Sequence, residues 1–225
     1  MEKQVSRHRV RKNVAREILE NRDWAKLKEW AVESRNIRAL LSLTFDADML
    51  VRWRAIEAMG IAAEIQGRND MENVREIIRN ILWMMNDESG ALAWHGPETI
   101  AEILYNIPSL ISEYGKILGS FTEEEPFERG TFWAIARISL RNSNFYQFKV
   151  DELIEALDNP DTTIKGYSLL GLKWLDYRVN GTKLGSLQND NSQVYIYNFE
   201  SGKLKRSEIS KIVQFYLNHI DWKMV

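Results

Sequence analysis

The sequence contains no cysteine, which excludes disulfides, thiolate nucleophiles, cysteine-based zinc sites and iron–sulfur clusters. With only four prolines, twelve glycines and no low-complexity run, it gives little reason to expect disorder away from its two ends. No stretch approaches the roughly 20 apolar residues of a membrane span. Residues 1–14 lack the apolar core of a secretory signal. A cytoplasmic protein without a membrane partner is therefore expected.

The sequence also lacks the common catalytic motifs. It has no glycine-rich phosphate loop, no dinucleotide-binding fingerprint and no recognisable Ser/His/Asp order. We therefore expect no enzyme, no catalytic residues and no cofactor.

The net charge is only −2, but the charges are unevenly distributed. Residues 1–22 carry seven Lys/Arg against three Glu, whereas residues 83–128 carry nine Asp/Glu against one Lys, a net charge of −8. The basic run Arg7-His8-Arg9-Val10-Arg11-Lys12 is suited to contact phosphates or an acidic partner. As the solvated face of a terminal helix, the run needs no function.

Helical periodicity dominates the remainder of the chain. Hydrophobic residues make up 44% of it, enough for a core, and they recur at the three-to-four spacing of amphipathic helices. Helices are expected near 4–20 and 23–33, and then in pairs at 36–45 with 47–66, 71–86 with 90–106, 108–119 with 126–142, and 150–158 with 162–178.

The second helix of each pair repeats a spacing of small residues that lets two helix backbones approach closely. The copies are Ala55/Ala58/Gly60, Gly96/Thr99/Ala101, Thr131/Ala134/Ala136 and, more weakly, Ser168/Gly171. A period near 40 residues with one helix pair per unit predicts an all-α fold, an α-α superhelix of the HEAT or armadillo type.

Two segments carry a resemblance to known families. Residues 46–60, Asp-Ala-Asp-Met-Leu-Val-Arg-Trp-Arg-Ala-Ile-Glu-Ala-Met-Gly, resemble the HEAT repeat of the phycobilisome-lyase type. Residues 83–98 are similar to a small bacterial and archaeal HEAT-repeat family with no assigned activity. The resemblance spans roughly residues 36–178. It implies a structural Asp–Arg ladder, which maps to Asp46 and Arg52 and, more loosely, to Asn159 and Lys165.

The C-terminal region changes character. Residues 193–199 alternate and are rich in β-formers, and Glu200-Ser201-Gly202 is a turn signal. A short β-hairpin is expected there, followed by a helix at about 207–220 with Ser207 as its N-cap. The expected organisation is one HEAT-repeat domain over residues 1–225. It has an N-terminal helical cap at 1–35, repeat units at 36–178, and the hairpin with its capping helix at 179–225.

Two sets of side chains are candidates for partner binding on the concave face. Trp53 and Trp94 occupy the same register in successive repeats, and the same offset relates Arg54 to His95 and Glu57 to Glu98. Aligned on neighbouring second helices, these side chains would form a surface that grips a peptide or helix. The alternative is that both tryptophans are core residues packed between repeats.

His95, Glu98 and Glu102 share one face of the expected helix at 90–106. Such a set suits a metal ion or an acid–base pair, but no second histidine lies nearby, so no metal site is expected. In the alternative interpretation the two glutamates lie on a solvated face.

The leading hypothesis is a non-enzymatic scaffold whose concave helical surface binds another protein or peptide. The second hypothesis is a lyase-like or chaperone subunit acting on a chromophore-bearing protein, implied by the phycobilisome-lyase resemblance alone. Nucleic-acid binding is the least favoured, because the acidic middle of the chain would repel a phosphate backbone.

Overall fold

The computed structural model describes residues 7–86 and 94–217 of the chain. Over these ranges it contains twelve α-helices and one two-stranded antiparallel sheet, which confirms the predicted helical character and the C-terminal hairpin. The chain divides into two compact units, Met1–Ile111 (unit 1) and Ser112–Val225 (unit 2). No helix in the described ranges combines the length and apolarity needed to cross a bilayer.

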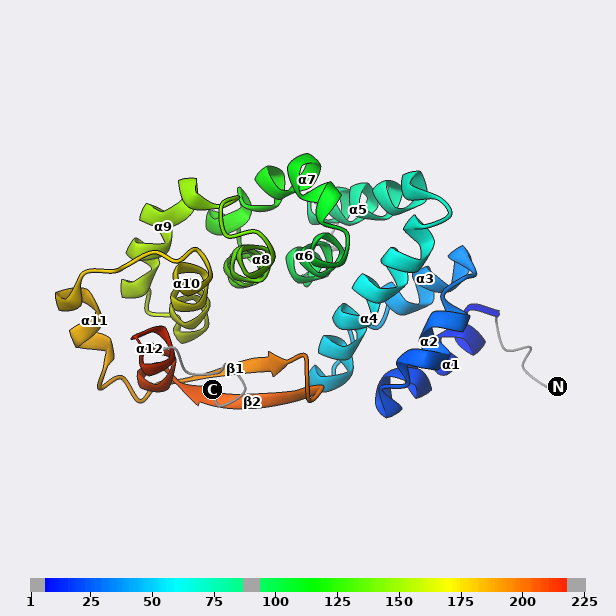
Figure 1. The fold of residues 1–225 in the computed structure, drawn as a ribbon. Coiled ribbons are helices and arrows are strands. Elements are labelled where there is room, and N and C mark those ends of the chain that lie inside the picture. The colour runs from blue at the N-terminus through cyan, green and yellow to red at the C-terminus, as the bar shows by residue number, and fades with distance from the viewer. Residues whose placement is uncertain (1–6, 87–93, 218–225) are drawn as a thin grey trace. The chain divides into compact units, whose positions relative to one another are not determined.

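Unit 1 is built around one long helix (Figure 1). This helix, α4, contacts every other helix of the unit, and its contact with α6 is the most extensive. The aspartates that precede α2, α4 and α5 accept hydrogen bonds from the first-turn N–H groups of those helices, which fixes where the helices begin. The helices of unit 1 are α1 (Arg7–Asn21), α2 (Trp24–Trp30), α3 (Ser34–Leu41), α4 (Met49–Gly67), α5 (Met71–Met85) and α6 (Gly96–Asn106).

The small residues of α4 permit its close approach to α6, as their spacing predicted. A Cβ atom on Gly60 would lie only 2.7 Å from the carbonyl oxygen of Glu102 and 2.4 Å from Nδ2 of Asn106. Only a residue without a side chain therefore fits at this point. The approach buries much of both helices, and α4 and α6 have buried residues around most of their circumference.

The start of α6 differs from the prediction. The periodicity predicted a helix from about residue 90, whereas α6 begins at Gly96, and Trp94 and His95 form a turn. Pro97 lies in the first helical turn, where its missing N–H costs nothing. A helix that began near residue 90 would place Pro97 in its interior, where proline removes a hydrogen bond and clashes with the preceding turn. Residues 90–93 lie outside the described ranges.

Unit 2 contains two helix pairs and a C-terminal extension. In Figure 1, α8 and α10 lie side by side, with α7 and α9 on one side of the pair and the hairpin on the other. The elements are α7 (Ile111–Leu118), α8 (Glu128–Arg141), α9 (Val150–Glu155), α10 (Thr162–Trp174), α11 (Gly181–Leu187), β1 (Gln193–Asn198), β2 (Lys203–Glu208) and α12 (Ile209–Leu217).

A buried tyrosine joins the two helix pairs of unit 2. The Tyr146 side chain is fully buried, and its hydroxyl donates a 2.6 Å hydrogen bond to the carbonyl oxygen of Gly115 in α7. Burial raises the pKa of the Tyr146 phenol. The hydroxyl therefore keeps its proton, and with it the hydrogen bond, well into the alkaline range.

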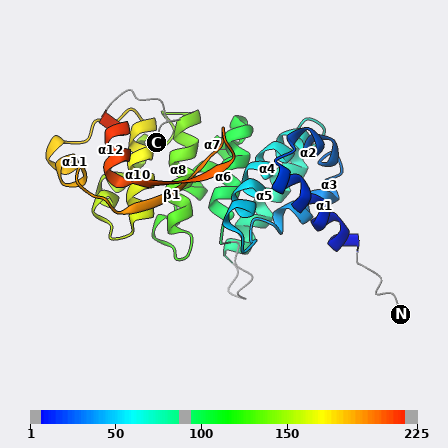
Figure 2. The ribbon, with the colours of Figure 1, turned by 90° about the horizontal axis from the view of Figure 1, so that it is seen from below.

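The hairpin crosses α10 and reaches α8, as the view from below shows (Figure 2). Its strands pair from Gln193↔Glu208 to Asn198↔Lys203. Phe199, at the end of β1, stacks on Trp133 of α8, and the Arg137 guanidinium lies 3.8 Å from the centre of the Phe199 ring. These aromatic and cation–π contacts hold the end of the hairpin against α8.

Two details of this extension were not predicted. The short helix α11 was missed, because its seven residues include two glycines and only two buried side chains, Leu184 and Leu187. Ser207 is a residue of β2 and does not cap a helix, since the chain passes from β2 into α12 at Ile209 without a loop. The predicted end of this helix, near residue 220, lies outside the described ranges.

Candidate functional site

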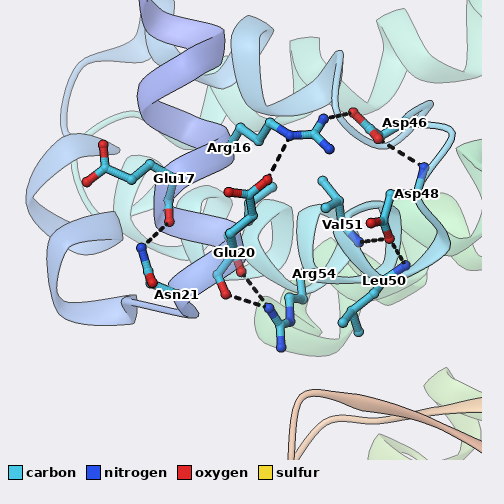
Figure 3. A network of polar contacts seen from close by, with 10 residues as sticks. Arg16, Glu17, Glu20, Asn21, Asp46, Asp48, Leu50, Val51 and Arg54 are labelled. Atoms are coloured by element: carbon cyan, nitrogen blue, oxygen red, sulfur yellow. Dashed lines mark hydrogen bonds and ion pairs between the residues drawn. The ribbon is translucent and has the colours of Figure 1, made fainter.

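The first candidate residues lie in a polar network between α1 and α4 (Figure 3). Arg16 of α1 bridges Glu20 at 2.8 Å and the Asp46 carboxylate at 2.5 Å. Arg54 of α4 donates hydrogen bonds to the last carbonyl oxygens of α1, those of Leu19 (3.1 Å) and Glu20 (2.8 Å). Arg54 therefore holds α1 against α4, and its guanidinium is used inside the unit.

The expected ladder residues belong to a turn motif that the described residues contain in both units. In unit 1, Asp46 accepts from the N–H of Asp48, and Asp48 caps α4. In unit 2, Asn159 accepts from the N–H of Asp161, and Asp161 caps α10. Arg52 donates to the backbone carbonyl of Asp46 at 3.1 Å. The carboxylate of Asp46 thus pairs with Arg16 of α1, whereas the Arg52 side chain, which the resemblance implied as its partner, contacts the backbone of Asp46.

Lys165, the counterpart of Arg52, pairs with an aspartate in the segment between α11 and β1. Its Nζ lies 2.9 Å from Oδ2 of Asp190, whose other oxygen accepts from Ser192. Burial would raise the pKa of Asp190, but the hydrogen bonds from Ser192 and Lys165 outweigh it and lower that pKa overall. Arg129 of α8 pairs in the same way with Asp161. In each of these pairs a cation on a helix holds an aspartate that lies just before the start of a later helix or strand.

Trp53 and Glu57 of α4 are internal residues. Trp53 is 7% exposed, and so is Glu57. Arg22, which follows α1, contacts both oxygens of the Glu57 carboxylate, at 2.7 and 3.3 Å. A buried carboxylate of this kind is stabilised by a charged partner that supplies two hydrogen bonds. Neither side chain has the exposure expected of a partner-binding surface, and for Trp53 the core interpretation is the one the structure favours.

Glu98 and Glu102 of α6 are also buried, at 6% and 2% exposure, so neither lies on a solvated face. Oε1 of Glu102 accepts a hydrogen bond from Asn106 at 3.2 Å. Oε1 of Glu98 lies 2.9 Å from Nδ1 of His95. Oε2 of Glu98 is buried and has no hydrogen-bond partner in the described structure. Glu98 therefore has an acceptor that its surroundings leave unused.

Trp94 differs sharply from its register partner Trp53. It is 60% exposed, and it lies in the turn that leads through His95 into α6. The side chain of His95 is 26% exposed. Of the seven residues predicted to bind a partner, Trp94 is largely exposed, and its neighbour His95 is partly exposed and contacts Glu98. The predicted alignment of both tryptophans on one surface required Trp94 to be helical, which the start of α6 at Gly96 prevents.

The described ranges hold no group of three or more His, Asp or Glu side chains arranged to bind a metal ion. Polar cavities exist elsewhere. In unit 2 a cavity of about 290 Å³ lies between the end of α10 and α12, and it is lined by Lys173, Asp176, Arg178 and Tyr216, among others. Lys173 and Tyr216 are engaged inside the unit, Lys173 with the backbone carbonyl of Tyr216 at 3.0 Å and the Tyr216 hydroxyl with the chain near residue 179. These hydrogen bonds therefore tie α12 to α10 and to the chain that follows α10.

The basic run at the N-terminus forms the first two turns of α1. Residues 7–10 are exposed, Val10 among them at 51%. The first side chain of α1 that is fully buried is Ala15. The structure thus places the run on a solvated part of the helix, as one of the two interpretations expected.

Comparison with known proteins finds a distant relative. The chain is 28% identical over 138 residues to an uncharacterized protein of Archaeoglobus fulgidus, and the match covers 60% of this chain and 72% of that protein. No protein-family model matches the chain. An archaeal relative without an assigned activity agrees with the resemblance of residues 83–98 and adds no chemistry to it.

Proposed function

We propose that the protein is a non-enzymatic binding protein of the HEAT-repeat type that holds another protein at the turn preceding α6. Two features support the repeat assignment. Helix pairs recur in both units, and the same capped turn, with a side-chain acceptor two residues before the capping aspartate, introduces α4 and α10. Repeats of this kind present side chains on a rigid stack of helices, and their common use is to bind other proteins.

The exposure of Trp94 is the observation that carries the binding proposal. Tryptophan is rarely left largely in water and is strongly enriched among the residues that dominate protein interfaces. With 60% of Trp94 exposed, a partner that covered it would remove on the order of 150 Å² of surface from water, roughly 3–4 kcal/mol as an upper bound.

The test is affinity capture from native lysate with the tagged wild-type protein and with Trp94→Ala, followed by titration of the purified partner. We expect Trp94→Ala to weaken the dissociation constant by about 10- to 100-fold, as for an interface tryptophan. Trp83→Ala is the matched control. Trp83 is 67% exposed, but it lies two residues from Ile81, which contacts α6, and so faces the opposite side of α5.

The proposal fails if Trp94→Ala binds the partner as tightly as the wild-type protein does, or if Trp83→Ala weakens binding equally. Arg54 is left unchanged in this test. Its side chain holds α1 against α4, so a loss of binding on its replacement would report on the fold of unit 1.

A further inference from the structure

The buried carboxylates of unit 1 differ in how they are satisfied. Glu57 has both oxygens on Arg22, and Glu102 has Asn106 and further contacts. Oε1 of Glu98 accepts a hydrogen bond from His95, and Oε2 of Glu98 is without a partner in the described structure. A buried carboxylate oxygen left unpaired is costly, and such groups in native proteins call for a specific explanation.

We propose that Glu98 is a receptor for a cationic side chain, an arginine guanidinium or a lysine ammonium, presented by the protein that binds at Trp94. This inference rests on the proposed function. It names the chemistry of the bound group, which is a cationic donor that hydrogen-bonds Oε2 of Glu98.

His95 is the route to this carboxylate. Its imidazole is partly exposed, it contacts Glu98 at 2.9 Å, and it belongs to the turn outside the helix. Rotation of an exposed side chain is fast. A cation that enters beside His95 takes up the free acceptor of Glu98, either with the imidazole in place or with the imidazole turned outward.

The surroundings favour an organic cation over the alternatives. Trp94, next to His95 in the chain, offers an exposed indole face, which is the best aromatic partner for a guanidinium or ammonium group. A metal ion is disfavoured, because the described ranges contain no cluster of three suitable ligands. An anion is disfavoured by the carboxylate itself and by the charge of residues 83–128, which carry nine acidic residues against one lysine.

The test uses small probes, so that it is independent of the partner protein. Protein labelled with 5-fluorotryptophan is titrated with Nα-acetyl-arginine methylamide and with Nα-acetyl-lysine methylamide, and the ¹⁹F signal of Trp94, assigned with Trp94→Phe, is followed. The neutral analogues with citrulline and with Nε-acetyl-lysine are the matched ligands. The two cationic arms decide between guanidinium and ammonium.

We expect at least one cation to shift the Trp94 signal with a dissociation constant on the order of millimolar, as for a single side chain. We expect its neutral analogue to bind roughly tenfold or more weakly, and Glu98→Gln to lose the preference for the cation. Glu64→Gln on α4 is the control, because it removes the same charge from an exposed pair with Arg68.

Equal binding of cationic and neutral probes to the wild-type protein would overturn the inference, and this result does not depend on the folding of any variant. So would an unchanged preference in Glu98→Gln. If Trp94→Ala loses the partner protein while neither cation binds, the cation receptor is wrong and protein binding at Trp94 stands. If the cations bind and Trp94→Ala keeps its partner, the proposed function is the part that fails.

Discussion

Replacing Gly60 by alanine tests the contact between α4 and α6 on which unit 1 depends. In an unobstructed helix this substitution stabilises by about 1 kcal/mol, because glycine is a poor helix former. At Gly60 the new Cβ would lie 2.7 Å from the carbonyl oxygen of Glu102, whereas ordinary contact begins near 3.4 Å. The two helices must therefore separate by about 0.7 Å along this line.

The obstacle is backbone and cannot rotate away, so the strain should lie near the upper end of the overpacking range, about 3 kcal/mol. Subtracting the gain of about 1 kcal/mol in helix propensity leaves a net destabilisation of about 2 kcal/mol, roughly a 30-fold fall in the folding equilibrium constant. Urea unfolding followed by far-UV circular dichroism measures this change. A Gly60→Ala protein as stable as the wild type would refute the reasoning.

The matched control is Gly185→Ala in α11. Gly185 is exposed and helical, and a Cβ there meets no atom within 4 Å. The same substitution should therefore stabilise by about 0.5–1 kcal/mol. The opposite signs at the two glycines separate close packing from helix propensity, which acts equally at both.

Two further predictions concern unit 2. Tyr146→Phe removes a buried hydrogen bond and leaves the carbonyl oxygen of Gly115 with one acceptor contact fewer, so it should destabilise by about 1–2 kcal/mol in thermal unfolding, and a variant as stable as the wild type would show that the bond contributes nothing. The pKa of Asp190 is lower in the folded protein than in the unfolded chain, so its stabilising pair with Lys165 is fully present above the unfolded pKa, near 4, and is lost as the pH falls through the folded pKa. Wild-type stability should therefore fall more steeply than that of Asp190→Asn between about pH 4 and pH 2, and parallel curves would contradict this assignment.

The sequence alone determined the features that depend on local chemistry. Apolar periodicity located most helices, because a helix that buries one face must repeat its apolar residues every three to four positions. The expected starts at residues 47 and 162 lie at or close to those of α4 and α10, where Asp48 and Asp161 satisfy the free N–H groups of the first turn. The hairpin followed from alternation and a Gly202 turn whose φ of 63° favours glycine.

The tertiary structure decided which of the predicted binding residues remain available. Trp53 and Trp94 share a register in the sequence, yet one is core and the other is exposed, because α6 begins two residues after Trp94. The spacing identified Glu98 as a candidate binding residue. Its burial and its unpaired oxygen could not be predicted, because both depend on how α6 packs. Spacing along a chain fixes the face on which a side chain lies within a helix, whereas the partner of that face is set by contacts between segments far apart in the sequence.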